Sequence, residues 1–216
     1  MTSLNLRYNQ TMKIKQSNQF FENIYRESQG DEEKIPWAKM QTDKHLEEYL
    51  KMHIGEGNAI VIGCGLGDDA AALEDAGFTV TAIDISETAI DWAKERYDYT
   101  DINFCIQDIF ELPSDMLAQY DFIFESRTIQ SLPLKFRNRI IEAISSLMAP
   151  RAKALVITNG KQEGEKFDGP PWPLEYNELR LFENHGCNEL EFSIFESDNK
   201  TSKLMFRALY QKQSEL

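Results

Sequence analysis

The sequence has few of the residues that build metal centres and disulfide frameworks. In 216 residues it holds three cysteines and three histidines, at Cys64, Cys105, Cys187, His45, His53 and His185. The cysteines are widely spaced and odd in number, so they predict neither a disulfide framework nor a zinc knuckle. None of the histidines has a ligand-like partner nearby in the sequence. We therefore expect no metal site.

Basic residues and long apolar runs are scarce as well. Lys and Arg together number 23 against 36 Asp and Glu, a formal net charge of −13. Such a surface repels a phosphate backbone, so nucleic acid is not expected as a substrate or partner. No apolar run reaches the roughly 18 residues of a membrane span, and residues 1–16 lack the apolar centre of a signal peptide. We therefore expect a cytoplasmic protein with no membrane partner.

What the sequence does contain is an alternation of strand and helix patterns. At 42% hydrophobic residues, a chain of 216 residues suits one domain with a single large core. Apolar runs and alternating segments predict strands at Ala59–Ile62, Thr79–Ile83, Asp101–Ile106, Tyr120–Glu125, Lys153–Thr158, Asn188–Glu196 and Ser202–Tyr210. Helices are expected between the earlier strands, and a hairpin turn at residues 198–200 joins the last two. The pattern predicts an α/β fold.

The most informative stretch runs from the first strand to Asp84. Gly63, Gly65 and Gly67 follow the strand at every second position, where glycine lets the backbone turn sharply and approach a ligand. The dinucleotide fingerprint G-x-G-x-x-G needs a glycine at position 68, but Asp68 stands there and would repel a pyrophosphate. Asp84, at the end of the second strand, can accept both hydroxyls of a ribose. The pattern favours a nucleoside cofactor without phosphate, such as S-adenosylmethionine.

The string V-I-G-C-G-L-G…A-I-D-I-S resembles the first two motifs of class I S-adenosylmethionine-dependent methyltransferases. The resemblance implies a Rossmann-like sheet of seven strands, mostly parallel with one antiparallel strand, and helices on both faces. It also implies S-adenosylmethionine as the cofactor. The residues expected to contact it are Trp37, Gly63, Cys64, Gly65, Leu66, Gly67, Asp84, Ile85, Asp108, Ile109 and Glu125.

Four of these residues have specific expected roles. Asp108 is expected to accept a hydrogen bond from the adenine amino group while Ile109 packs on the ring. Trp37 is expected to face the sulfonium, because an aromatic face stabilises a cation by roughly 0.5–2 kcal/mol; simple core packing is the alternative for this side chain. Cys64 is expected to be a small loop residue rather than a nucleophile.

In class I methyltransferases, helices ahead of the glycine loop often cover the cofactor. Helical patterns at Gln19–Glu27 and Asp43–His53 precede the first strand here. We therefore expect a flexible arm at residues 1–16, a helical cover of the cofactor site at residues 17–57, and the methyltransferase domain at residues 58–216. The whole is expected to form one globular domain.

Two further strings narrow the resemblance. F-F-E-N-I-Y-R-E-S…I-P-W and G-P-P-W-P-L-E-Y-N-E-L are similar to segments of thiopurine and related thiol methyltransferases. This implies a monomer or weak homodimer that methylates a small nucleophile, often sulfur. Bacterial thiopurine methyltransferases carry an acid–arginine pair after the fourth strand, whereas here Ser126 separates Glu125 from Arg127. The shift changes which way the arginine points, and this weighs against a thiopurine itself as the acceptor.

The acceptor is expected to lie among residues after the fourth and fifth strands. Glu125 and Arg127 are the expected catalytic residues, as a base and as a positive charge for a thiolate; a purely structural Glu125–Arg127 ion pair is the alternative. Residues 159–174 are expected to form a lid, with a stiff connector as the alternative. The residues expected to bind substrate are Arg127, Gln130, Phe167, Asp168 and Trp172.

The sequence leaves more than one function open. The first is a small-molecule methyltransferase acting on a thiol or thiopurine-like sulfur. The second is an N- or O-methyltransferase of a natural product or peptide, which would need a base such as Glu125 or Asp168. The third is a protein that binds S-adenosylmethionine without catalysis.

Overall fold

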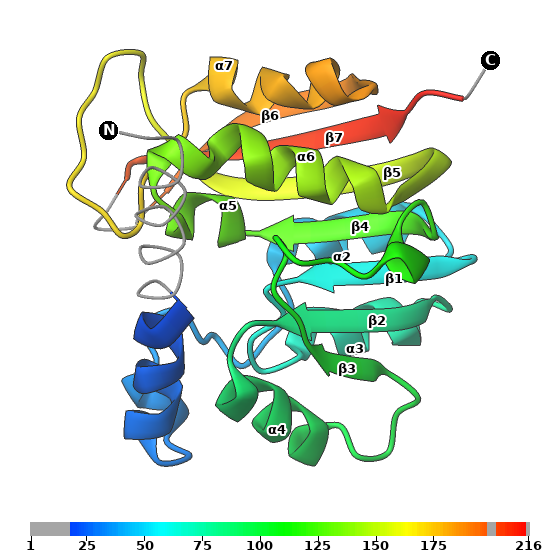
Figure 1. The fold of residues 1–216 in the computed structure, drawn as a ribbon, viewed down its shortest axis with the longest axis vertical. Coiled ribbons are helices and arrows are strands. Elements are labelled where there is room, and N and C mark those ends of the chain that lie inside the picture. The colour runs from blue at the N-terminus through cyan, green and yellow to red at the C-terminus, as the bar shows by residue number, and fades with distance from the viewer. Residues whose placement is uncertain (1–17, 198–201, 215–216) are drawn as a thin grey trace, which may run out of the picture.

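A computed structural model describes residues 18–197 and 202–214. The predicted arm at residues 1–16 and the predicted turn at residues 198–200 lie outside the described residues. The strands are β1 (Asn58–Ile62), β2 (Thr79–Asp84), β3 (Asn103–Ile106), β4 (Tyr120–Ser126), β5 (Met148–Gly160), β6 (Cys187–Glu196) and β7 (Leu204–Lys212). They form one seven-stranded sheet in the order β3-β2-β1-β4-β5-β7-β6 (Figure 1).

The sheet is parallel from β3 to β5, and β7 runs antiparallel to both of its neighbours. The strands at its centre are apolar runs, because both faces of a parallel sheet are covered. β1, for example, is buried at every position after Asn58. The structure confirms the predicted fold class, including the single antiparallel strand.

Helices pack on both faces of the sheet. The longer ones are α2 (Lys44–Met52), α3 (Asp68–Asp75), α4 (Glu87–Arg96) and α6 (Arg137–Leu147), and the short ones are α5 (Thr128–Ser131) and α7 (Tyr176–Leu179). One core cluster joins the sheet to α6 and α7, through side chains such as Ile140 and Leu179. A second cluster joins the other face to α2, α3 and α4, through Leu46, Leu73 and Ile90.

The segment ahead of β1 packs against the carboxyl ends of the central strands. Residues 18–28 are helical, and a 3-10 turn, η1 (Glu32–Lys34), follows. Glu22 fixes this helix to α4, because its carboxylate accepts the Ser86 hydroxyl at 2.7 Å and the Thr88 hydroxyl at 2.6 Å. Figure 1 shows the blue helix on the side where β1, β2 and β4 end. Its role as a cover of the site stays a prediction.

Several local structures differ from the predictions. The sequence pattern predicts one short helix at Glu175–His185, whereas the structure has α7 followed by a 3-10 helix, η4 (Arg180–His185). The turn after β4 contains the short helix α5. Its four residues are too few for a helical periodicity to be detected in the sequence. β5 begins earlier than expected, at Met148, which pairs with Tyr120 of β4; the register then shifts, so that Phe122 pairs with Lys153.

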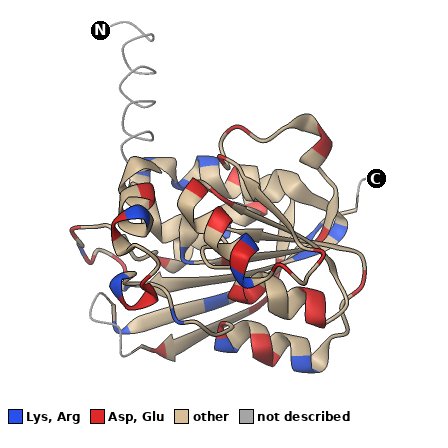
Figure 2. Ribbon diagram, turned by 90° about the horizontal axis from the view of Figure 1, so that it is seen from below, with Lys and Arg blue, Asp and Glu red and all other residues tan. Residues whose placement is uncertain are grey.

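Two general features of the described part of the chain bear on function. None of its helices is long and apolar enough to cross a membrane. Within residues 18–197 and 202–214, no group of three or more His, Cys, Asp or Glu side chains is placed to hold a metal ion. Figure 2 shows Asp and Glu residues, in red, spread over the helices and loops in that view, with Lys and Arg residues, in blue, scattered among them.

Candidate active site

Strand register brings the ends of β1, β2 and β4 to one edge of the sheet. Ile62 pairs with Ile83 on one side and with Glu125 on the other. The residues that follow these strands therefore lie side by side. A cavity of about 540 Å3 opens at this edge. The predicted site residues that line it are Trp37, Gly63, Cys64, Gly65, Leu66, Asp84, Ile85, Asp108, Ile109, Arg127 and Gln130.

The glycine loop has backbone conformations that favour glycine. Gly63, Gly65 and Gly67 all have positive φ, at 66°, 52° and 92°. A Cβ on Gly63 would also collide with the hydroxyl of Thr128, and one on Gly65 would lie 2.9 Å from the hydroxyl of Tyr25. Glycine at these two positions is therefore required by neighbouring protein groups as well as by the turn. Gly67 precedes α3 as its N-cap and does not line the cavity.

Asp84 occupies the position expected for a ribose-binding carboxylate. Its Oδ2 accepts the N–H of Gly65 at 2.9 Å and its Oδ1 accepts the N–H of Ser86 at 3.0 Å. Burial raises the pKa of Asp84, and these backbone N–H groups partly offset that rise. The carboxylate is thus held at the cavity wall by the glycine loop itself. Each oxygen keeps a further lone pair for a hydroxyl.

Asp108 and Ile109 follow β3 and line the same cavity. The Asp108 carboxylate accepts the N–H of Phe110 at 2.8 Å and the side-chain amide of Asn18 at 3.3 Å. Asp108 is therefore held by its own turn and by the N-terminal helix.

Trp37 lies in the cavity wall and is held there by a hydrogen bond. Its Nε1–H donates to the Tyr25 hydroxyl at 2.7 Å.

Asp68, which replaces the third glycine of the dinucleotide fingerprint, is paired inside the protein. Its carboxylate accepts two hydrogen bonds from Arg96, at 2.7 Å and 3.0 Å, and one from the hydroxyl of Tyr97. A bidentate pair of this kind fixes both partners. The position that would face a pyrophosphate in a dinucleotide fold thus holds a carboxylate, which agrees with a cofactor that lacks phosphate.

The described residues fit S-adenosylmethionine. The cavity contains a carboxylate at the end of β2, a carboxylate and an apolar side chain after β3, and two glycines of positive φ, Gly63 and Gly65, that leave the backbone bare of side chains. These features suit a ribose, an adenine and a chain lying along the backbone, in that order.

Comparison with known proteins assigns the chain to a family. Residues 27–213 match the Thiopurine S-methyltransferase (TPMT) family. The chain belongs to this family. It is therefore a class I methyltransferase that uses S-adenosylmethionine.

The individual relatives are distant. The chain is 26% identical to a thiopurine S-methyltransferase of Pseudomonas fluorescens, over 67% of this chain and 75% of that protein. It is also 26% identical to a 2-heptyl-1-hydroxyquinolin-4(1H)-one methyltransferase of Mycobacteroides abscessus, over 74% of this chain and 72% of the relative. An N-methyltransferase of Bradyrhizobium japonicum, solved with S-adenosylhomocysteine, shares the fold with a TM-score of 0.71 at 16% identity, covering 91% of this chain and 98% of that one.

Glu125 lies below the cavity rather than in its wall. Its side chain is fully buried, and Oε1 accepts the N–H groups of Thr128 at 2.6 Å and Ile129 at 2.9 Å. Among the described residues, Oε2 has no hydrogen-bond partner. Burial raises the pKa of Glu125 to about 7, although the two N–H groups and nearby arginines oppose the rise. Glu125 is thus a structural anchor of the turn after β4.

Arg127 turns away from Glu125. Its guanidinium makes an ion pair with Asp43 at 3.0 Å and donates to the Ser126 hydroxyl at 2.8 Å. The Glu125–Arg127 ion pair that we considered as an alternative is absent from the described structure, because the backbone at Arg127 is left-handed, with φ 68°. This conformation directs the side chain toward the segment ahead of α2.

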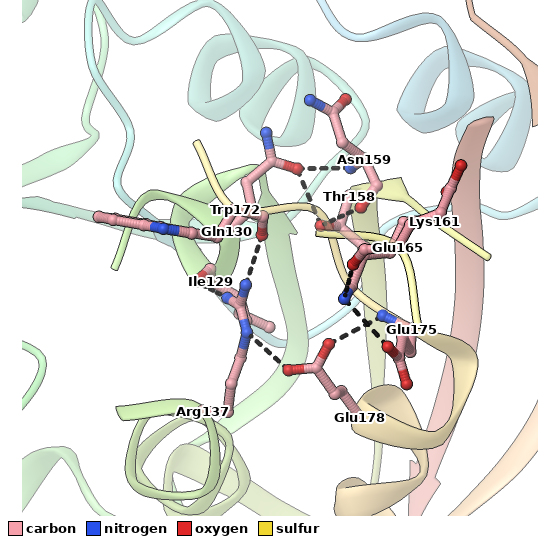
Figure 3. A network of polar contacts seen from close by, with 10 residues as sticks. All are labelled: Ile129, Gln130, Arg137, Thr158, Asn159, Lys161, Glu165, Trp172, Glu175 and Glu178. Carbon is pink, nitrogen blue, oxygen red and sulfur yellow. Dashed lines mark hydrogen bonds and ion pairs between the residues drawn. The ribbon is translucent and has the colours of Figure 1, made fainter. Parts of the chain in front are cut away.

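Gln130 and Arg137 fasten the loop after β5 to the sheet (Figure 3). The side-chain oxygen of Gln130 accepts the Thr158 hydroxyl at 2.9 Å, and its backbone oxygen accepts the N–H of Trp172 at 2.7 Å. The buried guanidinium of Arg137 donates to the backbone oxygens of Ile129 and Trp172 and to the carboxylate of Glu178. Both ends of the loop are therefore held.

The predicted substrate residues of this loop lie away from the cavity wall. Phe167, Asp168 and Trp172 do not line it, and Asp168 is exposed. The loop instead contributes Pro170 and Pro171. The ring of Trp172 is folded back on Gly169, which a Cβ at that glycine would meet. The lid and substrate roles of this loop stay predictions.

The structure adds charged residues that we did not expect at the site. Lys39, Asp43 and Asp69 all line the cavity near Arg127. Asp43 also caps α2, where its carboxylate accepts the N–H of His45 at 3.0 Å. A helix-cap pattern was visible in the sequence at this residue, but no local signal indicates that Arg127, 84 positions later, would pair with it.

Proposed function

We propose that this methyltransferase transfers a methyl group to a sulfur atom of a small molecule. The observation that carries this is the division of charge after β4: Arg127 lines the cavity, whereas the fully buried Glu125 lies outside its wall. A thiol has an ordinary pKa near 8.5 and ionises readily beside a positive charge. An amine or hydroxyl acceptor would need a base within reach of its proton.

The residues that hold the cofactor are assigned by their places in the cavity. Asp84 takes the ribose hydroxyls, Asp108 and Ile109 take the adenine, and the backbone from Gly63 to Leu66 lies along the amino-acid part. Trp37 faces the sulfonium. When bound, S-adenosylmethionine supplies a methyl carbon that its own sulfonium has already activated.

The chain's own contribution is placement and exclusion of water. The N-terminal helix covers one side of the cavity with Phe20, Phe21 and Ile24, and the loop after β5 closes another side with its prolines. Holding two reactants in line can supply several kcal/mol of the barrier, and a dry site strengthens the field of Arg127. Transfer to a thiolate requires no proton removal during the displacement.

A second acceptor class has one specific support. The relative from Mycobacteroides abscessus is named for a ring compound that carries a hydroxyl on nitrogen. An oxygen or nitrogen acceptor is therefore the alternative. It would require a base other than the withdrawn Glu125.

A screen with a labelled methyl donor tests the proposal. Purified protein is given labelled S-adenosylmethionine with matched small thiols, phenols, amines and peptides. We expect labelled thioethers as the main products, at a rate that falls when Arg127→Met is used. Labelling confined to phenols or amines would contradict the sulfur assignment. Binding of the cofactor with no transfer to any acceptor would support the non-catalytic alternative.

A further inference from the structure

Four charged side chains meet in the cavity wall beside the glycine loop. They are two cations and two anions, Lys39, Arg127, Asp43 and Asp69. They come from the segment before α2, from the first turn of α3, and from the turn after β4. Three separate elements thus bring charges of both signs to one part of the wall.

Asp43 is already committed to the two cations. It is only 3% exposed, and it pairs with Arg127 at 3.0 Å and with Lys39 at 4.0 Å. The same buried oxygen, Oδ2, makes both ion pairs but no hydrogen bond within the described chain. The negative charge of Asp43 is therefore neutralised by cations of the protein itself.

Asp69 is in a different position. Its Oδ1 accepts the backbone N–H of Asp43 at 2.7 Å, and no hydrogen bond between described residues reaches its Oδ2. The preceding residue, Asp68, is engaged by Arg96 through both of its oxygens. Of the two acidic residues that open α3, only Asp69 has an oxygen left for a group that enters the cavity.

We propose that Asp69 is a second cofactor-binding carboxylate, which binds the ammonium group at the amino-acid end of S-adenosylmethionine. This inference rests on the cofactor placement given under the proposed function, in which the amino-acid part lies along Gly63–Leu66. Asp69 follows that backbone directly, in the first turn of α3. The neighbouring cation Lys39, whose distance to Asp43 is 4.0 Å, supplies the opposite sign that the carboxylate at the same end of the cofactor needs.

The protonation of Asp69 should then be linked to binding. Burial and the nearby carboxylates of Asp43 and Asp68 raise the pKa of Asp69 to about 7, and the Asp43 N–H and Arg127 act against them. Lys39 also lies in this cluster. A bound ammonium favours the ionised carboxylate, so below pH 7 binding should release a proton.

Calorimetry with two ligands tests the assignment. S-adenosylhomocysteine carries the ammonium, and 5′-methylthioadenosine is a thioether nucleoside without the amino-acid end. Asp69→Asn keeps an oxygen for the Asp43 N–H but loses the charge. We expect this substitution to weaken the affinity for S-adenosylhomocysteine at least tenfold, roughly the value of one hydrogen bond to a charged group. The affinity for 5′-methylthioadenosine should change less than about threefold.

Asp75→Asn is the matched control, because it makes the same change at an exposed residue of α3, roughly 9 Å further along the helix. It should leave both affinities unchanged. Asp69→Asn protein that binds S-adenosylhomocysteine as tightly as the parent overturns the inference, and so does equal weakening of both ligands. A folded parent that binds neither ligand contradicts the cofactor placement itself, which separates the two failures.

A proton count gives an independent readout. At pH 6 the heat of S-adenosylhomocysteine binding is measured in buffers of different ionisation enthalpy. The parent should release up to about one proton per ligand, and Asp69→Asn should release none. Glu125→Gln should keep the release, although the Glu125 pKa is also about 7, because this side chain lies outside the cavity wall. Proton release that persists in Asp69→Asn contradicts the assignment.

Discussion

The two halves of the cavity are built in different ways. In the placement proposed above, the cofactor half consists of the Gly63–Leu66 backbone, Asp84 and Asp108, and the acceptor half consists of the turn after β4 together with Pro170 and Pro171. In the cofactor half, backbone N–H groups hold both carboxylates: those of Gly65 and Ser86 donate to Asp84, and that of Phe110 donates to Asp108, which also accepts the side-chain amide of Asn18. In the acceptor half, the supporting contacts cross long stretches of chain, such as Arg137 with Trp172 and Arg127 with Asp43.

Because of this difference, we expect cofactor binding and acceptor binding to change independently of each other. A turn that holds its own carboxylate keeps its geometry when distant residues change. A loop held by distant side chains changes shape when any of those side chains is replaced. The family can therefore keep one cofactor while its members differ in acceptor, and substitutions in each half should affect one ligand and spare the other.

The largest expected effect comes from Arg137→Met. Removing this buried guanidinium leaves three acceptors without their donor: the buried backbone oxygen of Ile129, the partly buried backbone oxygen of Trp172 and the carboxylate of Glu178. We expect the free energy of unfolding to fall by about 3 kcal/mol or more and the KM of the acceptor to rise. The Kd of S-adenosylhomocysteine should change less than about twofold. Urea unfolding and calorimetry measure these quantities.

The exposed neighbour Arg139 provides the control for that prediction. Arg139→Met should change stability by less than about 0.5 kcal/mol. If Arg137→Met weakens binding of the cofactor as much as binding of the acceptor, the two halves are not independent.

Glu125 gives the next largest effect, as a dependence of stability on pH. Its pKa is 4.5 in the unfolded chain and about 7 in the folded protein, so the folded state keeps the proton over a range where the unfolded state has lost it. The stabilisation is therefore complete below pH 4.5 and is lost as pH rises to 7, by about 3 kcal/mol. Glu125→Gln should remove this part of the slope in unfolding curves recorded from pH 4.5 to 8. An unchanged slope would show that the carboxylate is ionised in the folded state.

Gly63 and Thr128 mark the point where the two halves touch. Gly63→Ala should destabilise the protein by about 2 kcal/mol, because it combines a left-handed backbone with a collision at the Thr128 hydroxyl. Adding Thr128→Ala removes the collision and leaves only the backbone strain. The double-mutant cycle should show a coupling of about 1 kcal/mol; additive effects would mean that the halves do not meet there.

The smallest expected effect concerns the backbone of Arg127. Because its φ is 68°, Arg127→Gly should be more stable than Arg127→Ala by about 1 kcal/mol. Both substitutions remove the ion pair with Asp43, so they should slow methyl transfer to the acceptor equally. Equal melting temperatures would indicate that the left-handed conformation is not retained.

Sequence reasoning reached the cofactor half because its signals are local. The positive φ angles of Gly63, Gly65 and Gly67 correspond to glycines in the sequence, and Asp84 follows a recognisable buried strand. The seven-stranded sheet with one antiparallel strand followed from the family resemblance and was confirmed.

The acceptor half could not be predicted in the same way. Arg127 and Asp43 are 84 positions apart, and no periodicity links two residues that meet only after the sheet has formed. The loop after β5 is aromatic and proline-rich in the sequence, but which of its side chains reach the cavity depends on where Gln130 and Arg137 hold its backbone. Pro170 and Pro171 therefore line the wall in place of Phe167 and Trp172.

One measurement tests the central claim most directly: calorimetric titration of the folded protein and of Asp84→Ala with S-adenosylhomocysteine. The parent should bind one ligand per chain, and Asp84→Ala should bind about 30-fold more weakly or worse, since two hydrogen bonds to a carboxylate are lost. Equal affinity in the two proteins, or a folded parent that does not bind, would contradict the placement of the cofactor at the carboxyl ends of β1 and β2.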